Sequence, residues 1–476
     1  MVVDKKTSKN ITGGTLVVPS SVSNKSRSVT ILKTLKARSA GASQNSCPNV
    51  PDGYEPLKNI NVDFLNALNT VVKNTTTDDC GKFSVEITDD IVKIKAVSPG
   101  NKDLVTDISV FKTVNSNLAV ASTIPANAKY QISAIQITGA NSVAFSVTDT
   151  VTNHAVIGMP QSALTTKIND TNSDVTNFSN AANIADPASV TLVMDASGSM
   201  AAKIYDENDD ILVDPADGSN YTRFRMTGIA AHIYLDNMPN TDETAITVFD
   251  GSVNFIDDAE IKRLVNYISS AVGASEDTVE YKFSEDGFTS DASGLRLIVD
   301  TYNPETEVIT TFGNYGTPPG PIRKHHDTPD LKAFASVYPW AGNTAVYDAM
   351  ILSLEKTAVR SNSRKIVIAM TDGQDNRSTN GEVNVIQSAL DKGIPVYTIG
   401  FGANVSANTS LKKIADDTNA TFFKVTGVDL ISAFRGIQTA ITFQYIASLG
   451  DDIKVGDTVE VSLHFDGTVI KRSVTK

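Results

Sequence analysis

The segment SVTLVMDASGS, residues 189–199, indicates the fold of the central part of the chain. It opens with a mainly apolar run without charged residues, which is typical of a strand buried on both faces of a parallel sheet. Comparable runs return later, at residues 245–249, 365–370, 394–399 and 421–425. Between them, apolar residues recur at helical spacing, at residues 222–238, 344–359, 382–392, 409–417 and 429–441. This alternation predicts an α/β domain with a doubly wound parallel sheet.

The residues before this domain are typical of a β-rich region. From residue 12 to about residue 191, short segments alternate apolar and polar residues between Gly, Asn, Asp and Pro, as strands with one buried face do. The exception is residues 62–72, VDFLNALNTVV, whose spacing predicts one short helix. Short strands joined by turns predict a β-sandwich-like domain.

Three strand-like segments end the chain, at residues 443–449, 458–465 and 469–474. We expect them to pack with the β-rich region, so that the α/β domain is inserted in that region or follows it. The predicted parts of the chain are a basic arm or edge strands at 1–45, a β-rich domain at 46–185, the α/β domain at 186–441 and C-terminal strands at 442–476.

Oxygen-bearing side chains gather at three predicted loops of the α/β domain. Asp195, Ser197 and Ser199 follow the first buried strand, Asp372 follows a second, and Thr344 opens a predicted helix. The carboxyl ends of parallel strands meet at one sheet edge, where open α/β folds bind ligands. Two carboxylates and three hydroxyls without His or Cys suit a hard divalent cation such as Mg²⁺, and five ligands leave room for one external group.

These motifs together resemble the von Willebrand factor A-type domain, over roughly residues 186–441. The resemblance implies a Rossmann-like sheet flanked by helices and an intact metal-ion-dependent adhesion site. The implied ligands of Mg²⁺, Mn²⁺ or Ca²⁺ are Asp195, Ser197, Ser199, Thr344 and Asp372. The implied partner is a protein or extracellular-matrix ligand with an acidic group, and the metal serves recognition and not catalysis.

The chain departs from this family pattern at two insertions, about residues 201–221 and 268–335. The first is acidic and predicts a hairpin or loop beside the metal, either a solvated flap or a second calcium site. The second contains the strand-like segments 278–283, 295–299 and 308–312, followed by a Pro-rich connector at 317–321. We expect it to form a small β-subdomain that overhangs the ion, and either shapes partner choice or blocks the site.

Composition excludes several functional classes. The 476 residues carry a net charge of −13 with a pI near 4.9, which argues against a nucleic-acid partner. No stretch reaches the roughly 18 apolar residues of a membrane helix. Residues 1–45 carry eight basic residues and one acidic residue, a balance of +7, so this arm is either a solvated tail or a surface for self-assembly.

Cys47 and Cys80 are the two cysteines. They enclose a stretch without His, which argues against zinc and is consistent with one loop-closing disulfide or with two unrelated thiols. The chain shows no apolar core of a signal peptide at its start. We expect a mature segment located extracellularly or at the cell surface; an intracellular chain is the alternative.

Three residues near Thr344 are candidates for the rim of the ligand site: Tyr338, Trp340 and Asn343. Core packing explains Trp340 equally well. No Ser–His–Asp or Cys–His arrangement and no nucleotide-binding loop is legible, so we do not expect an enzyme.

The leading hypothesis is an adhesin-type, metal-dependent binding protein. The alternative is a structural or assembly subunit of a surface filament, such as a pilus, in which the metal is mainly structural. A third option is an intracellular scaffold that couples such domains to ATPases.

Overall fold

The computed structural model describes a mixed α/β protein with several sheets, divided into two compact units. The first unit takes its described residues from Met1–Ser133, Ile137–Asp186 and Thr439–Lys476, and the second from Ala134–Gln136 and Pro187–Gln438. The structure describes residues 11–19, 47, 50, 54–86, 90–97, 101–107, 120–122, 124–125, 129–150, 154–205, 210–213, 218, 220–257, 259–260, 286–302, 308–310, 322–324, 335–337, 343–402, 405–425, 429–465 and 468–476.

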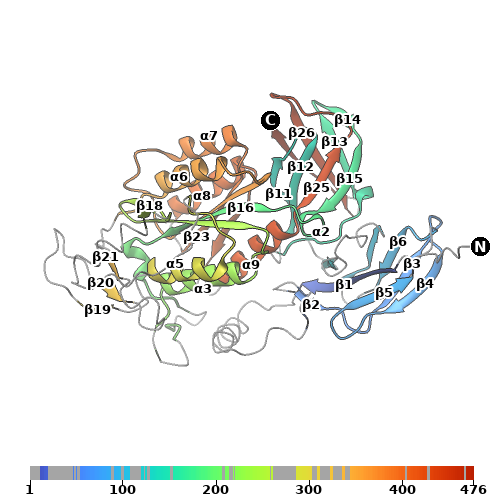
Figure 1. Ribbon diagram of the computed structural model, residues 1–476, viewed down its shortest axis with the longest axis horizontal. Coiled ribbons are helices and arrows are strands. Elements are labelled where there is room, and N and C mark those ends of the chain that lie inside the picture. The colour runs from blue at the N-terminus through green and yellow to red at the C-terminus, as the bar shows by residue number, and fades with distance from the viewer. Residues whose placement is uncertain are drawn as a thin grey trace, which may run out of the picture. The chain divides into compact units, whose positions relative to one another are not determined.

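The second unit is built on one sheet of six described strands (Figure 1). Their order across the sheet is β18-β17-β16-β22-β23-β24, and all neighbours are parallel except β18, which is antiparallel to β17. Every residue of β16 is buried, as its mainly apolar run predicts. The strands are β16 (Ala188–Asp195), β17 (Glu243–Phe249), β18 (Val253–Phe255), β22 (Arg364–Thr371), β23 (Val396–Phe401) and β24 (Phe422–Val425).

Helices cover both faces of this sheet. Figure 1 shows α6, α7 and α8 along one face and α3, α5 and α9 along the other. Their bounds are α3 (Arg223–Asp236), α5 (Ala292–Tyr302), α6 (Val346–Ala358), α7 (Glu382–Lys392), α8 (Val405–Asp417) and α9 (Asp429–Thr442), with a 3-10 turn, η3 (Gly198–Ala201), after β16.

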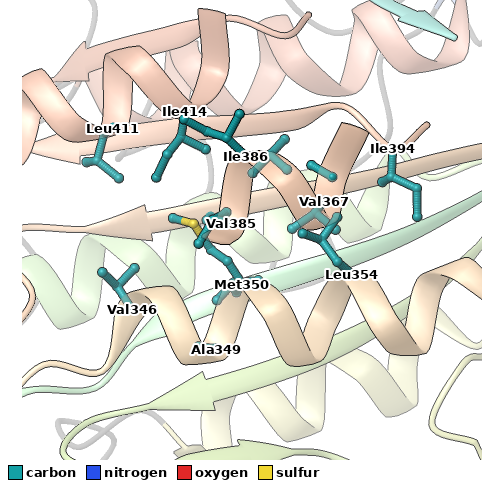
Figure 2. Close-up of a cluster of buried hydrophobic side chains, with 14 of the residues drawn as sticks. Val346, Ala349, Met350, Leu354, Val367, Val385, Ile386, Ile394, Leu411 and Ile414 are labelled. Carbon is teal, nitrogen blue, oxygen red and sulfur yellow. The ribbon is translucent and has the colours of Figure 1, made fainter. Parts of the chain in front are cut away.

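The core beneath α6, α7 and α8 follows from helical periodicity (Figure 2). Val346, Met350 and Leu354 recur every four residues, so they form one apolar stripe along α6 and are almost fully buried. This stripe packs with Val385 of α7, Leu411 of α8 and residues of the sheet. The packed core fixes the start of α6, and with it the loop that carries Thr344.

The predicted strand at residues 295–299 is wrong, because this segment lies in helix α5. Leu295, Ile298 and Val299 are almost fully buried, at the three- and four-residue spacing of a helix face. Asp291 precedes the helix, and its side chain accepts a hydrogen bond from the Ser293 backbone. A short apolar run without context does not distinguish strand from helix.

The rest of the second insertion is described only in part. β19 (Val308–Thr310), β20 (Ile322–Lys324) and β21 (Ala335–Val337) form a small antiparallel sheet. The predicted strand at 278–283 and the connector at 317–321 lie outside the described residues.

The described part of the first insertion contains isolated antiparallel bridges. Lys203 pairs with Thr222, Tyr205 with Ile211, and Val213 with Asn220. Of its acidic residues, Asp210 is described and exposed, whereas residues 206–209 and 214–217 lie outside the described range.

The C-terminal strands pair with strands that precede the second unit in sequence. β25 lies between β12 and β15, and β26 pairs with β13 on one side and β27 on the other. Ile446 of β25, for example, is in register with Ala144 and Ser179. The strands are β11 (Tyr130–Ile137), β12 (Ser142–Asp149), β13 (Leu164–Ile168), β14 (Thr171–Ser173), β15 (Val175–Asn180), β25 (Tyr445–Leu449), β26 (Thr458–Phe465) and β27 (Thr468–Thr475), with helices η2 (Gln161–Ala163) and α2 (Ala181–Ile184).

The N-terminal part of the first unit consists of further short strands. β1 pairs with β2, β5 and β9, while β3, β4, β6 and β8 form a second sheet. The strands are β1 (Ile11–Pro19), β2 (Tyr54–Pro56), β3 (Asn61–Leu65), β4 (Val71–Thr76), β5 (Lys82–Glu86), β6 (Lys93–Ala96), β7 (Asn101–Lys102), β8 (Leu104–Asp107), β9 (Val120–Ser122) and β10 (Ile124–Pro125). Residues 1–10 and 20–45 of the predicted arm lie outside the described residues.

The predicted helix at residues 62–72 is also wrong, because these residues form the β3–β4 hairpin. The side chain of Asn66 accepts hydrogen bonds of 3.0 Å from the backbone N–H groups of both Leu68 and Thr70, which favours a turn. Val62 and Phe64 then alternate into the core, and both are 0% exposed. The helical spacing arose by chance where two strands meet across a turn.

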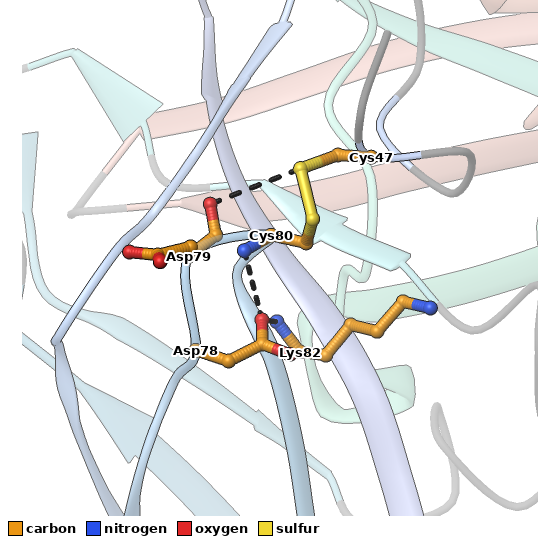
Figure 3. Close-up of a disulfide and its surroundings, with 5 residues drawn as sticks. All are labelled: Cys47, Asp78, Asp79, Cys80 and Lys82. Carbon is orange, nitrogen blue, oxygen red and sulfur yellow. Dashed lines mark hydrogen bonds between the residues drawn. A yellow bond between two sulfur atoms is a disulfide. The ribbon is translucent and has the colours of Figure 1, made fainter.

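Cys47 and Cys80 form a disulfide with a Cα–Cα distance of 5.1 Å (Figure 3). The Asp78 side chain accepts hydrogen bonds of 2.8 Å from the backbone N–H groups of Cys80 and Lys82, so the turn before β5 holds Cys80 in place. Among the described residues, no helix is long and apolar enough to span a membrane.

Replacement of both cysteines by serine should destabilise the first unit by about 3–4 kcal/mol, because the bond closes a loop with a sequence separation of 33. Urea denaturation of the oxidised protein, the reduced protein and the double variant, followed by circular dichroism, measures this. Equal midpoints for the oxidised and reduced proteins would contradict it.

Candidate metal centre

Asp195 is held at the carboxyl edge of the six-stranded sheet. Met194 of β16 is in register with Met370 of β22, so Asp195 lies beside Thr371. The Thr371 hydroxyl donates a 2.5 Å hydrogen bond to Asp195 Oδ2, and the Ser197 backbone N–H donates a 2.7 Å bond to Oδ1. Both carboxylate oxygens therefore have a donor, and Asp195 is buried, with 3% of the residue exposed.

The two serines connect this loop to the end of β22. Ser197 Oγ and Ser199 Oγ are 3.1 Å apart, and the Ser199 hydroxyl donates a 2.6 Å hydrogen bond to Asp372 Oδ1. Ser199 and Asp372 are separated by 173 positions in the sequence. The structure thus brings together Asp195, Ser197, Ser199 and Asp372 from two separate loops.

The other carboxylate oxygen of Asp372, Oδ2, forms an ion pair with a positively charged side chain. The guanidinium of Arg223, the first residue of α3, forms an ion pair with Asp372 Oδ2. Nothing in the sequence pattern pointed to this residue, because Arg223 lies 24 positions beyond Ser199, after the first insertion.

Thr344 approaches from a third loop, before α6. Its backbone N–H donates to Asn376 Oδ1 at 2.8 Å, and its carbonyl accepts from the Asn376 backbone N–H at 3.1 Å. A Cβ atom on Gly373 would lie 3.4 Å from Thr344 Oγ1 and 3.7 Å from Ser199 Oγ. The two hydroxyls therefore flank the Gly373 backbone, and a larger residue at this position would fill the space next to them.

Burial is the main cause of a raised pKa at Asp195. Burial first, and then the negative charge of Asp372, raise the pKa of Asp195 to about 7, although hydrogen bonds from Thr371 and Ser197 oppose the rise. The two carboxylates thus repel each other across the cluster. A cation bound between them would relieve this repulsion.

The donor set fits a hard divalent cation. Carboxylate and hydroxyl oxygens are the ligand types that Mg²⁺, Mn²⁺ and Ca²⁺ prefer, and the hydroxyls of Ser199 and Thr344 lie close to the same glycine. Among the described residues, no group of three or more His, Cys, Asp or Glu side chains is arranged to hold a metal ion. With two carboxylates, the candidate site therefore depends on its hydroxyls and on water for the remaining ligands.

The structure also places other residues considered at the sequence level. Asn343 is partly buried beside Thr344, whereas Tyr338 and Trp340 lie outside the described residues. Sequence reasoning missed Thr371, Arg223 and Asn376 as neighbours of the site. The Thr-Asp-Gly end of β22 was a signal for Thr371, since residues next to a ligand at a strand end share its edge.

Comparisons with known proteins place a domain over part of this region. Residues 325–436 match the profile of the von Willebrand factor type A domain, a range that contains Thr344 and Asp372 but not Asp195. No curated protein matches the chain.

Several solved structures resemble this chain, each with a low TM-score. The PilB minor pilin from Streptococcus sanguinis is 11% identical, with 91% of this chain and 92% of that chain covered and a TM-score of 0.31. The von Willebrand factor type A structure from Catenulispora acidiphila is 12% identical, with 74% of each chain covered and a TM-score of 0.31. The conserved hypothetical protein BatB from Bacteroides thetaiotaomicron is 16% identical, with 54% of this chain and 97% of that chain covered and a TM-score of 0.32.

Likenesses at these scores establish neither a shared function nor a shared assembly. The similarity of this chain to the von Willebrand factor type A domain therefore rests on the profile match at residues 325–436.

Proposed function

We propose that this chain is an adhesin-type binding protein that uses a divalent cation at Asp195, Ser197, Ser199, Thr344 and Asp372 to recognise an acidic group of a protein or matrix ligand. The observation that carries the proposal is the hydrogen-bonded cluster of Asp195, Ser197, Ser199 and Asp372. Two loops that are far apart in the sequence meet there, and every side chain in the cluster offers oxygen atoms as metal ligands.

The chemistry of the cluster favours recognition over catalysis. A bound Mg²⁺, Mn²⁺ or Ca²⁺ would supply a positive centre for an anionic ligand group. Serine and threonine hydroxyls are neutral ligands, so they leave more of the charge of the cation available than carboxylates would. We do not assign an enzymatic role.

The proposed scaffold is a doubly wound, Rossmann-like domain inserted in a β-sandwich-like host. The sheet order and the helices on both faces support the first part. The pairing of β25 with both β12 and β15 supports the second, because the host strands come from before and after the domain.

An extracellular or cell-surface location is part of the proposal. The Cys47–Cys80 disulfide supports it, because disulfides persist mainly in oxidising compartments.

Metal binding tests the proposal directly. We expect calorimetry on EDTA-treated protein to show association with Mg²⁺, Mn²⁺ or Ca²⁺. Asp195→Asn or Ser199→Ala should weaken the affinity at least about tenfold, because each removes a ligand. Asp416→Asn, which removes the same charge on the exposed face of α8, is the matched control and should bind as the wild type does. No heat of association with any of the three ions would overturn the proposal.

Ligand binding should depend on the same hydroxyls. Binding to a panel of immobilised matrix proteins, measured by interferometry, should disappear in EDTA and in Thr344→Val, which removes the hydroxyl and keeps the shape of the side chain. The melting temperature of the EDTA-treated variant should stay close to that of the EDTA-treated wild type. Binding that persists unchanged in EDTA would rule out a metal-mediated contact.

The alternative function is that of an assembly subunit, and β27 is the observation that favours it. β27 is the last strand in its sheet among the described residues, and an edge strand is a template for pairing with another chain. β1, by contrast, already pairs with three strands of its own unit, so residues 11–19 are engaged.

Assembly through β27 should not require a metal. Light scattering over a range of protein concentrations should show oligomers in EDTA as well as in MgCl₂. A monomer under both conditions would remove the support for this alternative.

A further inference from the structure

We propose that Arg223 is a resident counter-charge of the candidate metal centre: its guanidinium holds Asp372 in the absence of a divalent cation and weakens cation binding. This inference rests on the function proposed above. It assigns to Arg223 a role in setting the cation affinity of the site.

The first observation is the ion pair itself. The Asp372 side chain is 0% exposed, and its two oxygens accept from different partners, Ser199 on Oδ1 and Arg223 on Oδ2. A buried carboxylate without a positive partner is costly, so Arg223 stabilises the metal-free site.

The second observation is that the guanidinium of Arg223 packs against two residues at the end of β23. Its Cζ atom lies 5.7 Å from the centroid of the Phe401 ring, within cation–π range. A Cβ atom on Gly402, where φ is +95°, would lie 3.3 Å from Arg223 Nη2. The end of β23 thus provides an aromatic face and a residue without a side chain where the guanidinium packs.

The third observation is that Arg223 is tied to a proposed metal ligand through the backbone. The Arg223 N–H donates to the Ala202 carbonyl, and the Ala202 N–H donates to the Ser199 carbonyl, each at 3.1 Å. The first insertion therefore leaves the metal loop at Ser199 and returns at Arg223. Two backbone hydrogen bonds therefore link Ser199 to Arg223 through Ala202.

The net charge of the cluster determines whether Arg223 raises or lowers the affinity for a cation. When both carboxylates are ionised, Asp195 and Asp372 together carry −2, and Arg223 reduces the charge of the cluster to −1. A divalent cation either displaces the guanidinium from Asp372 or binds next to a positive charge, and both reduce its affinity. The same charge makes the cation-loaded cluster positive by one unit, which favours an anionic ligand group.

The test is cation affinity in variants of the full chain that differ in this one charge. Arg223→Gln should bind Mg²⁺ about tenfold more tightly than the wild type in calorimetry, since it removes the competing charge, a difference equivalent to about 1.4 kcal/mol. Its melting temperature in EDTA should fall, and its rise on adding MgCl₂ should exceed that of the wild type. Arg223→Lys keeps the charge and should bind with nearly wild-type affinity.

Arg225→Gln is the matched control. It removes the same charge two residues away, where the guanidinium lies over the Tyr221 ring at 4.6 Å from its centroid. It should leave Mg²⁺ affinity unchanged. Arg223→Met, which keeps the apolar stem next to Phe401, gives a second charge-removing variant if Arg223→Gln does not fold.

Each outcome separates this inference from the proposed function. Equal affinity in the wild type and Arg223→Gln, weaker binding in Arg223→Gln, or equal tightening in Arg225→Gln overturns the role of Arg223 and leaves the proposed function in place. Binding in Arg223→Gln alone, with none in the wild type, supports the role of Arg223 and overturns the proposed function. No binding in any variant overturns both.

Discussion

The parallel register of β16 and β22 is the constraint on which the candidate site depends. Pairing of Met194 with Met370 puts Asp195 next to Thr371, and the 2.5 Å hydrogen bond between their side chains follows from this register. In a parallel pair, both strands end at the same edge, so the loops that carry Ser199 and Asp372 leave the sheet together. A slip of one residue would turn Asp195 to the other face of the sheet.

The hydrophobic packing of α6 on the sheet also helps to position the residues at the carboxyl edge of the sheet. The buried stripe of Val346, Met350 and Leu354 fixes the helix on the sheet, and the mutual hydrogen bonds of Thr344 and Asn376 join its first turn to the loop after β22. The loops that carry the site residues are therefore anchored to packed strands and helices, and hydrogen bonds connect these loops to one another. This is the arrangement that a binding site needs when it must keep its geometry without a ligand.

The candidate site contains a positive charge in addition to the two aspartates that the sequence analysis identified. Two aspartates alone would repel each other strongly, and the raised pKa of Asp195 reflects burial and that repulsion. Arg223 offsets one of the two charges from a helix that begins only after the first insertion. The insertion lies between the loop that carries Ser199 and the arginine that pairs with Asp372.

The sequence by itself determined the strand–helix alternation of the second unit and singled out the oxygen-bearing residues at its strand ends, because buried parallel strands and amphipathic helices leave distinct periodicities. It did not determine short elements: residues 62–72 form a hairpin through the turn at Asn66, and residues 295–299 lie in a helix packed on its buried face. Only the tertiary structure revealed the ion pair of Arg223 with Asp372 and the place of β25 between β12 and β15. Local patterns encode which face of an element is buried. Contacts such as Arg223 with Asp372, 149 positions apart, or Ala144 with Ile446, 302 positions apart, depend on how whole elements pack, which no local pattern specifies.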